Sequence, residues 1–327
     1  MVKKVFLSGV QPSGRPHIGN YFGAMKQFVE LQEEYTGYIL IVDYHALHSL
    51  RDPKAMRENI IGVLLDFLAI GLNPEKVTIF KQSDISEHTE LTWIFDTITT
   101  MPYLMRAHAF KDAEAKDKEI DVGTFNYPVL MATDILLYDT DMVPVGADQK
   151  QHVEICRDIA EKFNNIYGET FKLPKPVIPK SGARIMDLIE PTKKMSKSDD
   201  REGRTLPLLA STDQLRSAIM GATTDSQKEI RFDASRPGIY NLLEIYEGVT
   251  RTSREEIESK FSGKGYGDFK KDLAEEVIAF LAPFQKRYQE LIDNPSHLED
   301  LLKEGKVRAE ELANKKLAEV KSKVGLG

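Results

Sequence analysis

Apolar and polar residues follow two different patterns in the first half of the chain. Nearly continuous apolar runs predict buried strands at residues 3–9, 37–47, 76–84 and 141–146. Apolar residues at helical spacing predict helices at residues 21–35, 53–71, 127–138 and 147–163. We expect Pro128 to open the third of these helices. Residues 87–118 are helix-rich, and residues 171–180 are expected to be extended.

The strand pattern largely disappears after residue 206, and the remainder predicts helices that include residues 269–292 and 306–324. Strand–helix alternation followed by a helical tail predicts an α/β protein with a doubly wound, Rossmann-like parallel sheet and a C-terminal all-helical domain. We place the first domain at residues 1–206, with a helical insertion at about 53–121, and the helical domain at 207–327.

Composition narrows the class of protein. No apolar run reaches the roughly 20 residues of a membrane span, and the N-terminus does not read as a signal peptide. The single cysteine, Cys156, excludes an internal disulfide and any multi-cysteine iron–sulfur cluster, so we expect a cytoplasmic protein without a membrane partner. A net charge of −7 argues against a wholly nucleic-acid-binding surface, although a local basic track remains compatible with it.

The stretch SGVQPSGRPHIGNY, residues 8–21, follows the first predicted strand and leads into a helix. One reading is a plain turn built from proline and glycine. The other is a phosphate-binding loop, in which Gly19 lets a ligand approach the helix start. His17 and Asn20 lie three residues apart on one face of that first turn, where both could donate to phosphate oxygens.

The stretch KKMSKSDD, residues 193–200, also has two readings. Lysine-rich segments are usually solvated surface loops. Alternatively, Lys194 and Lys197 belong to a mobile loop whose ammonium groups reach a triphosphate, because lysine is a point charge on a flexible stem.

The two stretches together resemble the paired signatures of class I aminoacyl-tRNA synthetases, with Asn20 in place of the second histidine of the first signature. The first follows the first predicted strand, and the second follows the last one. In a doubly wound sheet both then lie at the carboxyl edge, where ligands bind.

A third pattern concerns the helix predicted at 127–138. Tyr127, Met131, Asp134 and Tyr138 fall on one helical stripe. A partly exposed face would leave Asp134 in water. However, the helix is apolar nearly all round, so we expect Asp134 to be buried and to need a hydrogen-bond donor. An aromatic ring with one N–H, an indole, would supply that donor.

These stretches, with IVDYHA, GARIM and KGYGDFKKDLAE, are similar to the family of bacterial tryptophanyl-tRNA synthetases over most of the chain. The resemblance implies Asp134 as the acceptor for the indole N–H, with Tyr127 and Gln149 at the α-amino group. The implied tryptophan-binding residues are Asp134, Met131, Tyr127, Gln149, His45, Val42, Leu7, Ile135 and Val143. The implied ATP-binding residues are Gln11, Ser13, Gly14, Gly19, Asn20, Gly146, Asp148, Ile185, Lys194, Met195, Ser196, Lys197 and Ser198. The implied catalytic residues are Lys194, Lys197, Gln11, His17 and Asn20.

The resemblance also implies an activity: L-tryptophan is activated by ATP and passed to the 2′-hydroxyl of the terminal adenosine of tRNA(Trp). Mg²⁺ would be held mainly by the ATP phosphates, and no protein-bound metal or iron–sulfur cluster is expected. Family members are homodimers, so we look for an interface at residues 87–110, and the helical domain would read the anticodon. Ala113 stands where the family has a phosphate-reaching lysine, and either Lys111 or Lys116 replaces it or the contact is missing.

Four alternatives remain at this point. The nearest is a tyrosyl enzyme of the same class, separated by pyrophosphate exchange with the two amino acids. Small nucleotidyltransferases share the first signature but lack the second. A non-catalytic paralogue should have lost Lys194, Lys197 or Asp134, which are all present. A metal hydrolase built on His45 and His48 lacks a nearby set of carboxylates.

Overall fold

The structure is a computed structural model of the whole chain. It describes residues 3–115, 120–146, 149–178, 184–197, 201–227, 229–293 and 295–327. Three predicted site residues lie outside the described residues: Lys116, Asp148 and Ser198.

The centre of the molecule is a five-stranded parallel sheet with the strand order β3-β2-β1-β4-β5. Its strands are β1 (Val5–Val10), β2 (Thr36–Ile41), β3 (Val77–Lys81), β4 (Met142–Pro144) and β5 (Lys175–Val177). In register, Val5 of β1 lies opposite Thr36 of β2, and Phe6 lies opposite Met142 of β4. β2 and β3 are added on one side of β1, and β4 and β5 are added on its other side. This reversal of the strand order confirms the predicted doubly wound α/β class.

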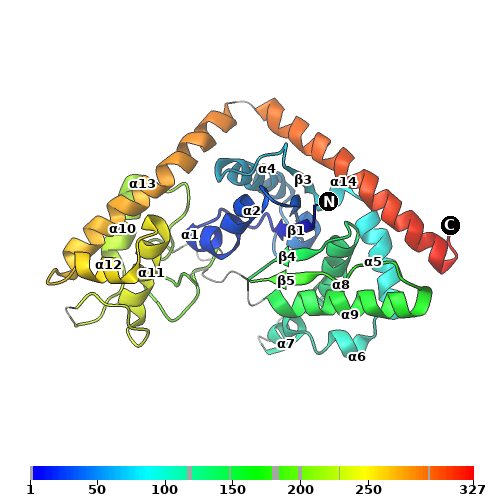
Figure 1. Cartoon of the computed structure of the whole chain (residues 1–327), viewed down its shortest axis with the longest axis horizontal. Coiled ribbons are helices and arrows are strands. Elements are labelled where there is room, and N and C mark those ends of the chain that lie inside the picture. The colour runs from blue at the N-terminus through cyan, green and yellow to red at the C-terminus, as the bar shows by residue number, and fades with distance from the viewer. Residues whose placement is uncertain are drawn as a thin grey trace.

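Helices surround this sheet in the described parts of the chain (Figure 1). Those before β4 are α1 (Ile18–Asn20), the π-helix η1 (Tyr21–Met25), α2 (Lys26–Leu31), α3 (Asp43–Ala46), α4 (Pro53–Ala69), the 3-10 turn η2 (Gln82–Asp84), α5 (Glu87–Ile98), α6 (Met101–Leu104), α7 (His108–Ala115) and α8 (Val122–Leu136). Those after β4 are α9 (Lys150–Tyr167), α10 (Thr212–Gly221), α11 (Pro237–Thr250), α12 (Arg254–Lys260), α13 (Tyr266–Ile292) and α14 (Pro295–Val324).

The two faces of the sheet bury two separate cores, as the alternation of side chains along a strand requires. Phe6 and Ile39 point into a core shared with α2, α4, α11 and α13. Their neighbours Leu7 and Leu40 point into the other core, shared with α5, α8, α9 and α14. β1 and β2 are therefore apolar on both sides, which explains their unbroken apolar runs in the sequence.

The last helix returns to the sheet. In Figure 1, α10 to α13 lie on one side of the molecule, α13 and α14 meet at the top, and α14 runs back across the sheet region. Ala309, Ala313 and Leu317 of α14 are buried in the second core. Gly305 allows this approach, because a Cβ there would lie 1.8 Å from the Ile79 carbonyl oxygen of β3. The predicted domain division stays a prediction, but α14 packs on the sheet and not on α10–α12.

Several predicted elements differ in their limits. The apolar run at 37–47 is a strand only as far as Ile41, and α3 begins at Asp43. Pro128 lies inside α8 and does not open it, because Asp121 caps the helix by accepting from Thr124 N. The predicted insertion at 53–121 contains β3, a strand of the central sheet.

Candidate functional site

A cavity of about 380 Å³ opens at the carboxyl edge of β1, beside the strand-order reversal between β1 and β4. All nine residues predicted for tryptophan line it: Leu7, Val42, His45, Tyr127, Met131, Asp134, Ile135, Val143 and Gln149. Gln11 also lines it, as predicted for the reacting end, together with Ser8, Gly9, Leu40 and Val145. We call it the first cavity. Most of its wall is apolar, and its polar side chains come from β1 and the residue after it, α3, α8 and the start of α9.

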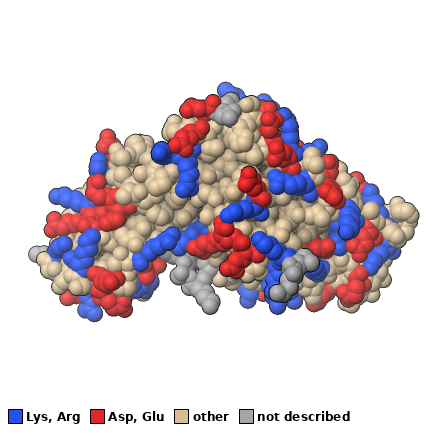
Figure 2. All heavy atoms as spheres, turned by 45° about the horizontal axis from the view of Figure 1, so that its top comes forward, with Lys and Arg blue, Asp and Glu red and all other residues tan. Residues whose placement is uncertain are grey.

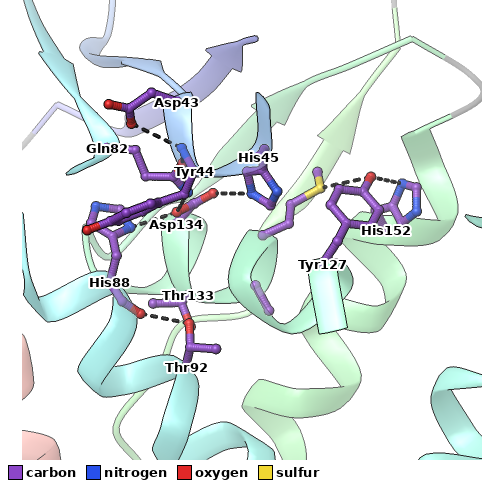
Figure 3. A network of polar contacts seen from close by, with 12 residues as sticks. Asp43, Tyr44, His45, Gln82, His88, Thr92, Tyr127, Thr133, Asp134 and His152 are labelled. Atoms are coloured by element: carbon purple, nitrogen blue, oxygen red, sulfur yellow. Dashed lines mark hydrogen bonds and ion pairs between the residues drawn. The ribbon is translucent and has the colours of Figure 1, made fainter. Parts of the chain in front are cut away.

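Asp134 is 4% exposed, so its predicted burial is confirmed and the reading that places it in water is wrong. Three side chains hold its carboxylate (Figure 3). Gln82 Nε2 donates to Oδ1 at 2.7 Å, and His88 Nδ1 contacts the same oxygen at 2.6 Å. His45 Nε2 contacts Oδ2 at 2.9 Å. The carboxylate is thus fixed by groups from three other elements, α3, η2 and α5.

The same contacts keep Asp134 ionised. Burial is the largest influence on the pKa of Asp134 and raises it, but the hydrogen bonds and charges of His45 and His88 together outweigh burial and hold the pKa below its usual range. A carboxylate only accepts, so each histidine must present a protonated nitrogen to it. Tyr138 Oη lies 2.9 Å from the other nitrogen of His88 and completes the chain.

The carboxylate retains one unused acceptor position. An ionised carboxylate offers about four lone-pair sites, and the three contacts occupy two on Oδ1 and one on Oδ2. Because Asp134 lines the first cavity, Oδ2 can accept one further hydrogen bond from a donor bound there. That arrangement suits a flat apolar ring with a single N–H.

A second polar group in the wall involves Tyr127, Gln149 and His152. Tyr127 Oη lies 3.1 Å from His152 Nδ1 and 3.5 Å from Gln149 Oε1. In Figure 3, Tyr127 and His152 lie on the other side of His45 from Asp134. Tyr127 Oη also lies 3.9 Å from the Met131 sulfur. The cavity therefore has a carboxylate at one polar point and neutral acceptors at another, which would suit a ring donor and an ammonium group.

The first signature loop is a capped helix start. His17 is the N-cap of α1, where its Nδ1 accepts from Asn20 N at 3.3 Å, and His17 N donates to Asn20 Oδ1 at 3.1 Å. The two side chains thus cap each other, and His17 Nε2 is buried without a hydrogen-bond partner among the described residues. Burial, with smaller effects of the Lys197 and Lys194 charges, lowers the pKa of His17 to about 3, so the ring is neutral.

The two signatures are in contact. A Cβ on Gly19 would lie 3.0 Å from His17 Nδ1 and 3.3 Å from Ile185 Cβ, so glycine fits the gap between His17, a predicted catalytic residue, and Ile185, a predicted ATP-binding residue. Gly14 has a φ of +105°, and the backbone oxygen of Lys197 lies beside it. His17, Gly14, Ser196 and Lys197 line a second cavity of about 550 Å³.

Sequence reasoning missed an ion pair beside this second cavity. Arg15 Nη2 lies 2.6 Å from Asp66 Oδ1, and the Arg15 guanidinium lies over the Tyr288 ring at 4.9 Å. Burial raises the pKa of Asp66 to about 7, against the opposing charges of Arg15 and Lys197. The available signal was Asp66 itself, a charge interrupting the apolar run 60–70. Gln82 and His88 were also missed, and no sequence signal joins them to Asp134.

Other predicted residues lie elsewhere. Gly146 follows β4, and its carbonyl accepts from Gln149 N at 2.9 Å. Lys111 and Ala113 lie on α7 and line neither cavity. Among the described residues, no three His, Cys, Asp or Glu side chains are grouped as metal ligands. Within the same residues, no helix has the length and apolar character needed to cross a membrane.

Comparison with known proteins gives one consistent result. The family described as tRNA synthetases class I (W and Y) matches residues 3–282. The tryptophan–tRNA ligase of Caldanaerobacter subterraneus is 50% identical over 326 residues, 99% of both chains. That of Bacillus subtilis is 47% identical over 327 residues, 100% of this chain and 99% of its own. The structure of Campylobacter jejuni tryptophanyl-tRNA synthetase with ADP and tryptophan superposes with a TM-score of 0.85 at 40% identity, covering 98% of this chain and 100% of the other.

Proposed function

The chain belongs to the class I tRNA synthetases for tryptophan and tyrosine, and we infer that it is the tryptophan enzyme: it activates L-tryptophan with ATP and transfers it to tRNA(Trp). In the first step a tryptophan carboxylate oxygen attacks the α-phosphorus of ATP, and pyrophosphate leaves. In the second, the 2′-hydroxyl of the terminal tRNA adenosine attacks the acyl carbon, and AMP leaves. Neither step needs a side-chain nucleophile.

The observation that carries the choice of amino acid is the buried, ionised Asp134 in the wall of an apolar cavity. We propose that Oδ2 accepts the indole N–H while Met131 and Ile135 contact the ring. A site built to hydrogen-bond a substrate group rejects analogues that lack it by roughly 10⁴–10⁵-fold, because its polar group is left unpaired. Phenylalanine lacks the donor and leaves part of the cavity empty. Tyr127 and Gln149 would hold the α-amino group, and Gln11 would lie near the reacting carboxylate and phosphate.

The phosphates would bind between the two signature loops. Class I chemistry here depends on alignment and on stabilising the charge of the leaving pyrophosphate. We propose that Lys194 and Lys197 supply that charge, and that the Nε2–H of neutral His17, which has no partner among the described residues, donates to a phosphate oxygen. Gly14, Gly19 and Ile185 would lie against the nucleotide, with Ser13, Asn20, Gly146, Met195 and Ser196 nearby. Mg²⁺, held by the ATP phosphates, would neutralise part of the triphosphate charge.

The helical region after residue 206 is the proposed anticodon reader. Lys and Arg are interspersed with Asp and Glu over the face shown in Figure 2, so any tRNA contact on that face would be made by local groups of cations. With tRNA and ATP as its substrates, the cytoplasm is the proposed location.

We propose a homodimer joined through α5 and α6. Trp93 is 72% exposed and Met101 is 66% exposed, and Met105 is exposed on the same segment, whereas Ile94 and Leu104 are buried. Large exposed apolar side chains in one segment are typical of an interface core. Trp93 is the only tryptophan in the chain. A blue shift of its emission with rising protein concentration, matched by a dimer mass in sedimentation equilibrium, is expected. A monomer mass at all concentrations would contradict the proposal.

The experiment that tests the function is ATP–pyrophosphate exchange with each of the twenty amino acids. Tryptophan should support exchange at least 10⁴-fold better than phenylalanine, as expected for a buried hydrogen-bond acceptor. Tyrosine as the preferred amino acid would instead favour the tyrosyl alternative. Charging of tRNA(Trp) transcripts with labelled tryptophan then tests the second step.

A further inference from the structure

The second signature, as far as the structure describes it, begins in a short hairpin, residues 185–195. Met186 pairs with Lys194 in an antiparallel bridge. The flanking backbone bonds run from Asp187 N to Lys193 O at 2.8 Å and from Met195 N to Ile185 O at 3.1 Å. In such a pair the N–H and C=O of Met186 itself point away from Lys194, toward the outer edge of the hairpin. A backbone edge inside a protein needs partners.

Asn241 of α11 provides those partners. Its Oδ1 accepts from Met186 N at 2.8 Å, and its Nδ2 donates to Met186 O at 2.9 Å. Asn241 is 3% exposed. A carboxamide carries an acceptor and a donor side by side, as a peptide group does, so Asn241 takes the place of a neighbouring strand. An aspartate could accept from Met186 N but could not donate to Met186 O.

The rest of the hairpin is also tied to the helical region. Thr223, directly after α10, donates its N–H to Leu188 O at 2.7 Å and its hydroxyl to Ile189 O at 2.7 Å. Arg204 Nη1 donates to Asp187 Oδ2 at 3.0 Å. Asn241 of α11 and Thr223, which follows α10, therefore both hold the hairpin against the helical region.

The hairpin carries two of the residues predicted to bind ATP, Ile185 and Lys194. Ile185, on its first arm, packs against Gly19 of the first signature. Lys194 is on its second arm, and Lys197 follows three residues later. We propose that Asn241 is a positioning residue for adenylate formation: by fixing both backbone groups of Met186, it sets the place of Ile185 and of the signature lysines relative to the first signature. This inference rests on the proposed function for the identity of the nucleotide.

Asn241→Ala tests it, with Asn164→Ala as the matched control. Asn164 of α9 makes the same kind of clamp on a backbone, with Nδ2 donating to Phe171 O at 2.8 Å and Oδ1 accepting from Thr170 N and Phe171 N at 3.0 Å. It lines neither cavity. Both variants lose an amide clamp on the backbone, buried at Asn241 and half-buried at Asn164, so both should lower the melting temperature.

Only Asn241→Ala should change the nucleotide reaction. In pyrophosphate exchange we expect the KM for ATP to rise about tenfold and kcat to fall at least tenfold, with the tryptophan KM changed less than about twofold, as for loss of a residue that orients binding groups. Asn241→Asp, which lacks the donor, should be impaired in the same direction. The proposal would be overturned if Asn241→Ala and Asn164→Ala had equal melting temperatures and Asn241→Ala kept the wild-type KM for ATP. Equal rises in the KM values for ATP and for tryptophan in Asn241→Ala would also overturn it.

Two measurements separate this proposal from the choice of amino acid. Equilibrium dialysis with labelled ATP, without any amino acid, should show weaker binding for Asn241→Ala than for wild type and Asn164→Ala. Hydrogen–deuterium exchange of the peptide spanning residues 184–197 should be faster in Asn241→Ala alone. If wild type prefers another amino acid but these two differences hold, the proposed substrate fails and the role of Asn241 stands. If they are absent, Asn241 has no positioning role.

Discussion

The two halves of the proposed site, for the amino acid and for the phosphates, are built in different ways. The amino-acid side is a cavity enclosed by β1, α3, α8 and the segment from β4 to α9, and its central carboxylate is already held by three side chains. The phosphate side is made of two loops, and it is supported mainly through backbone contacts such as the Asn241 clamp. Its cations, Arg15 and Lys197, lie close enough for their charges to oppose each other, with Asp66 as the nearby anion.

The contrast follows from the tasks. Recognition of an indole needs a fixed acceptor, because a preorganised dipole costs no reorganisation when the substrate binds. Phosphoryl chemistry needs positive charge that can follow the departing pyrophosphate, which a flexible lysine on a loop provides. Mutations on the amino-acid side should therefore change selectivity, and mutations on the phosphate side should change rate.

The largest effect is expected for Asp134→Asn. The amide keeps the shape of the side chain but removes the buried anion, so kcat/KM for tryptophan should fall about 10⁴-fold while ATP binding is retained. Pyrophosphate exchange and ATP dialysis measure the two quantities. Asp96→Asn is the control. Asp96 is a partly buried carboxylate of α5 that accepts from Asn126 of α8, the helix that carries Asp134. Unchanged tryptophan kinetics in Asp134→Asn would remove the basis for the choice of amino acid.

Lys197→Ala should give the reverse pattern. Loss of one charge-stabilising group should slow adenylate formation by roughly 10²–10³-fold and leave the tryptophan affinity unchanged. Rapid-quench measurement of adenylate, with tryptophan binding by calorimetry, separates the two. Lys193→Ala serves as the control, because Lys193 is an exposed lysine of the same segment paired with Glu190. Equal losses of rate and tryptophan affinity would indicate misfolding instead.

The support of Asp134 can be tested at His88. His88→Leu removes the donor to Asp134 Oδ1 and should raise the tryptophan KM about tenfold, the usual size for a residue that orients a binding group. His88→Asn can still donate from nearly the same position and should recover most of that loss. The ATP KM should not change in either variant. If the two variants are equally impaired, the hydrogen bond to Asp134 is not what His88 contributes.

The smallest effect concerns Asp66 and pH. Its pKa is about 7 in the folded protein, above the 3.8 of an ordinary aspartate, so the folded state binds more protons between about pH 4 and 7. Stability from this residue is therefore present at low pH and lost as the pH rises through 7. Between pH 5 and 6, Asp66 should lower the free energy of unfolding by about 1 kcal/mol, and Asp66→Asn should abolish this part of the pH dependence. Urea unfolding at the two pH values measures the difference. An identical pH dependence in the two proteins would contradict the raised pKa.

Much of the amino-acid side could be predicted from the sequence. The apolar runs predicted β1 to β4, and βα alternation predicted a parallel, doubly wound sheet, although it did not determine the strand order. The burial of Asp134 could be predicted because the residues around it on the same helix are nearly all apolar, which is a property of the local sequence. Resemblance then placed nine residues, all of which line the first cavity.

The remainder depends on contacts between distant residues. Gln82 and His88 precede Asp134 by 52 and 46 residues, and Asn241 follows Met186 by 55. No periodicity or motif joins such pairs. Pro128 was misread because proline usually opens a helix, whereas Asp121 supplies the cap here. Residues 42–47 were wrongly predicted as part of a strand. The apolar run continues past the end of β2 into α3, so it does not mark where the strand ends.

The return of α14 to the sheet has a mechanical consequence. The chain leaves the sheet region before α10 and comes back to it where α13 gives way to α14, so α10–α13 are joined to the rest at two separate points. Two chain connections, together with the core that α11 and α13 share with α2 and α4, restrict how far α10–α13 can move independently of the sheet. Gly305, which lets α14 lie directly against β3, therefore helps to hold the second of these two connections in place.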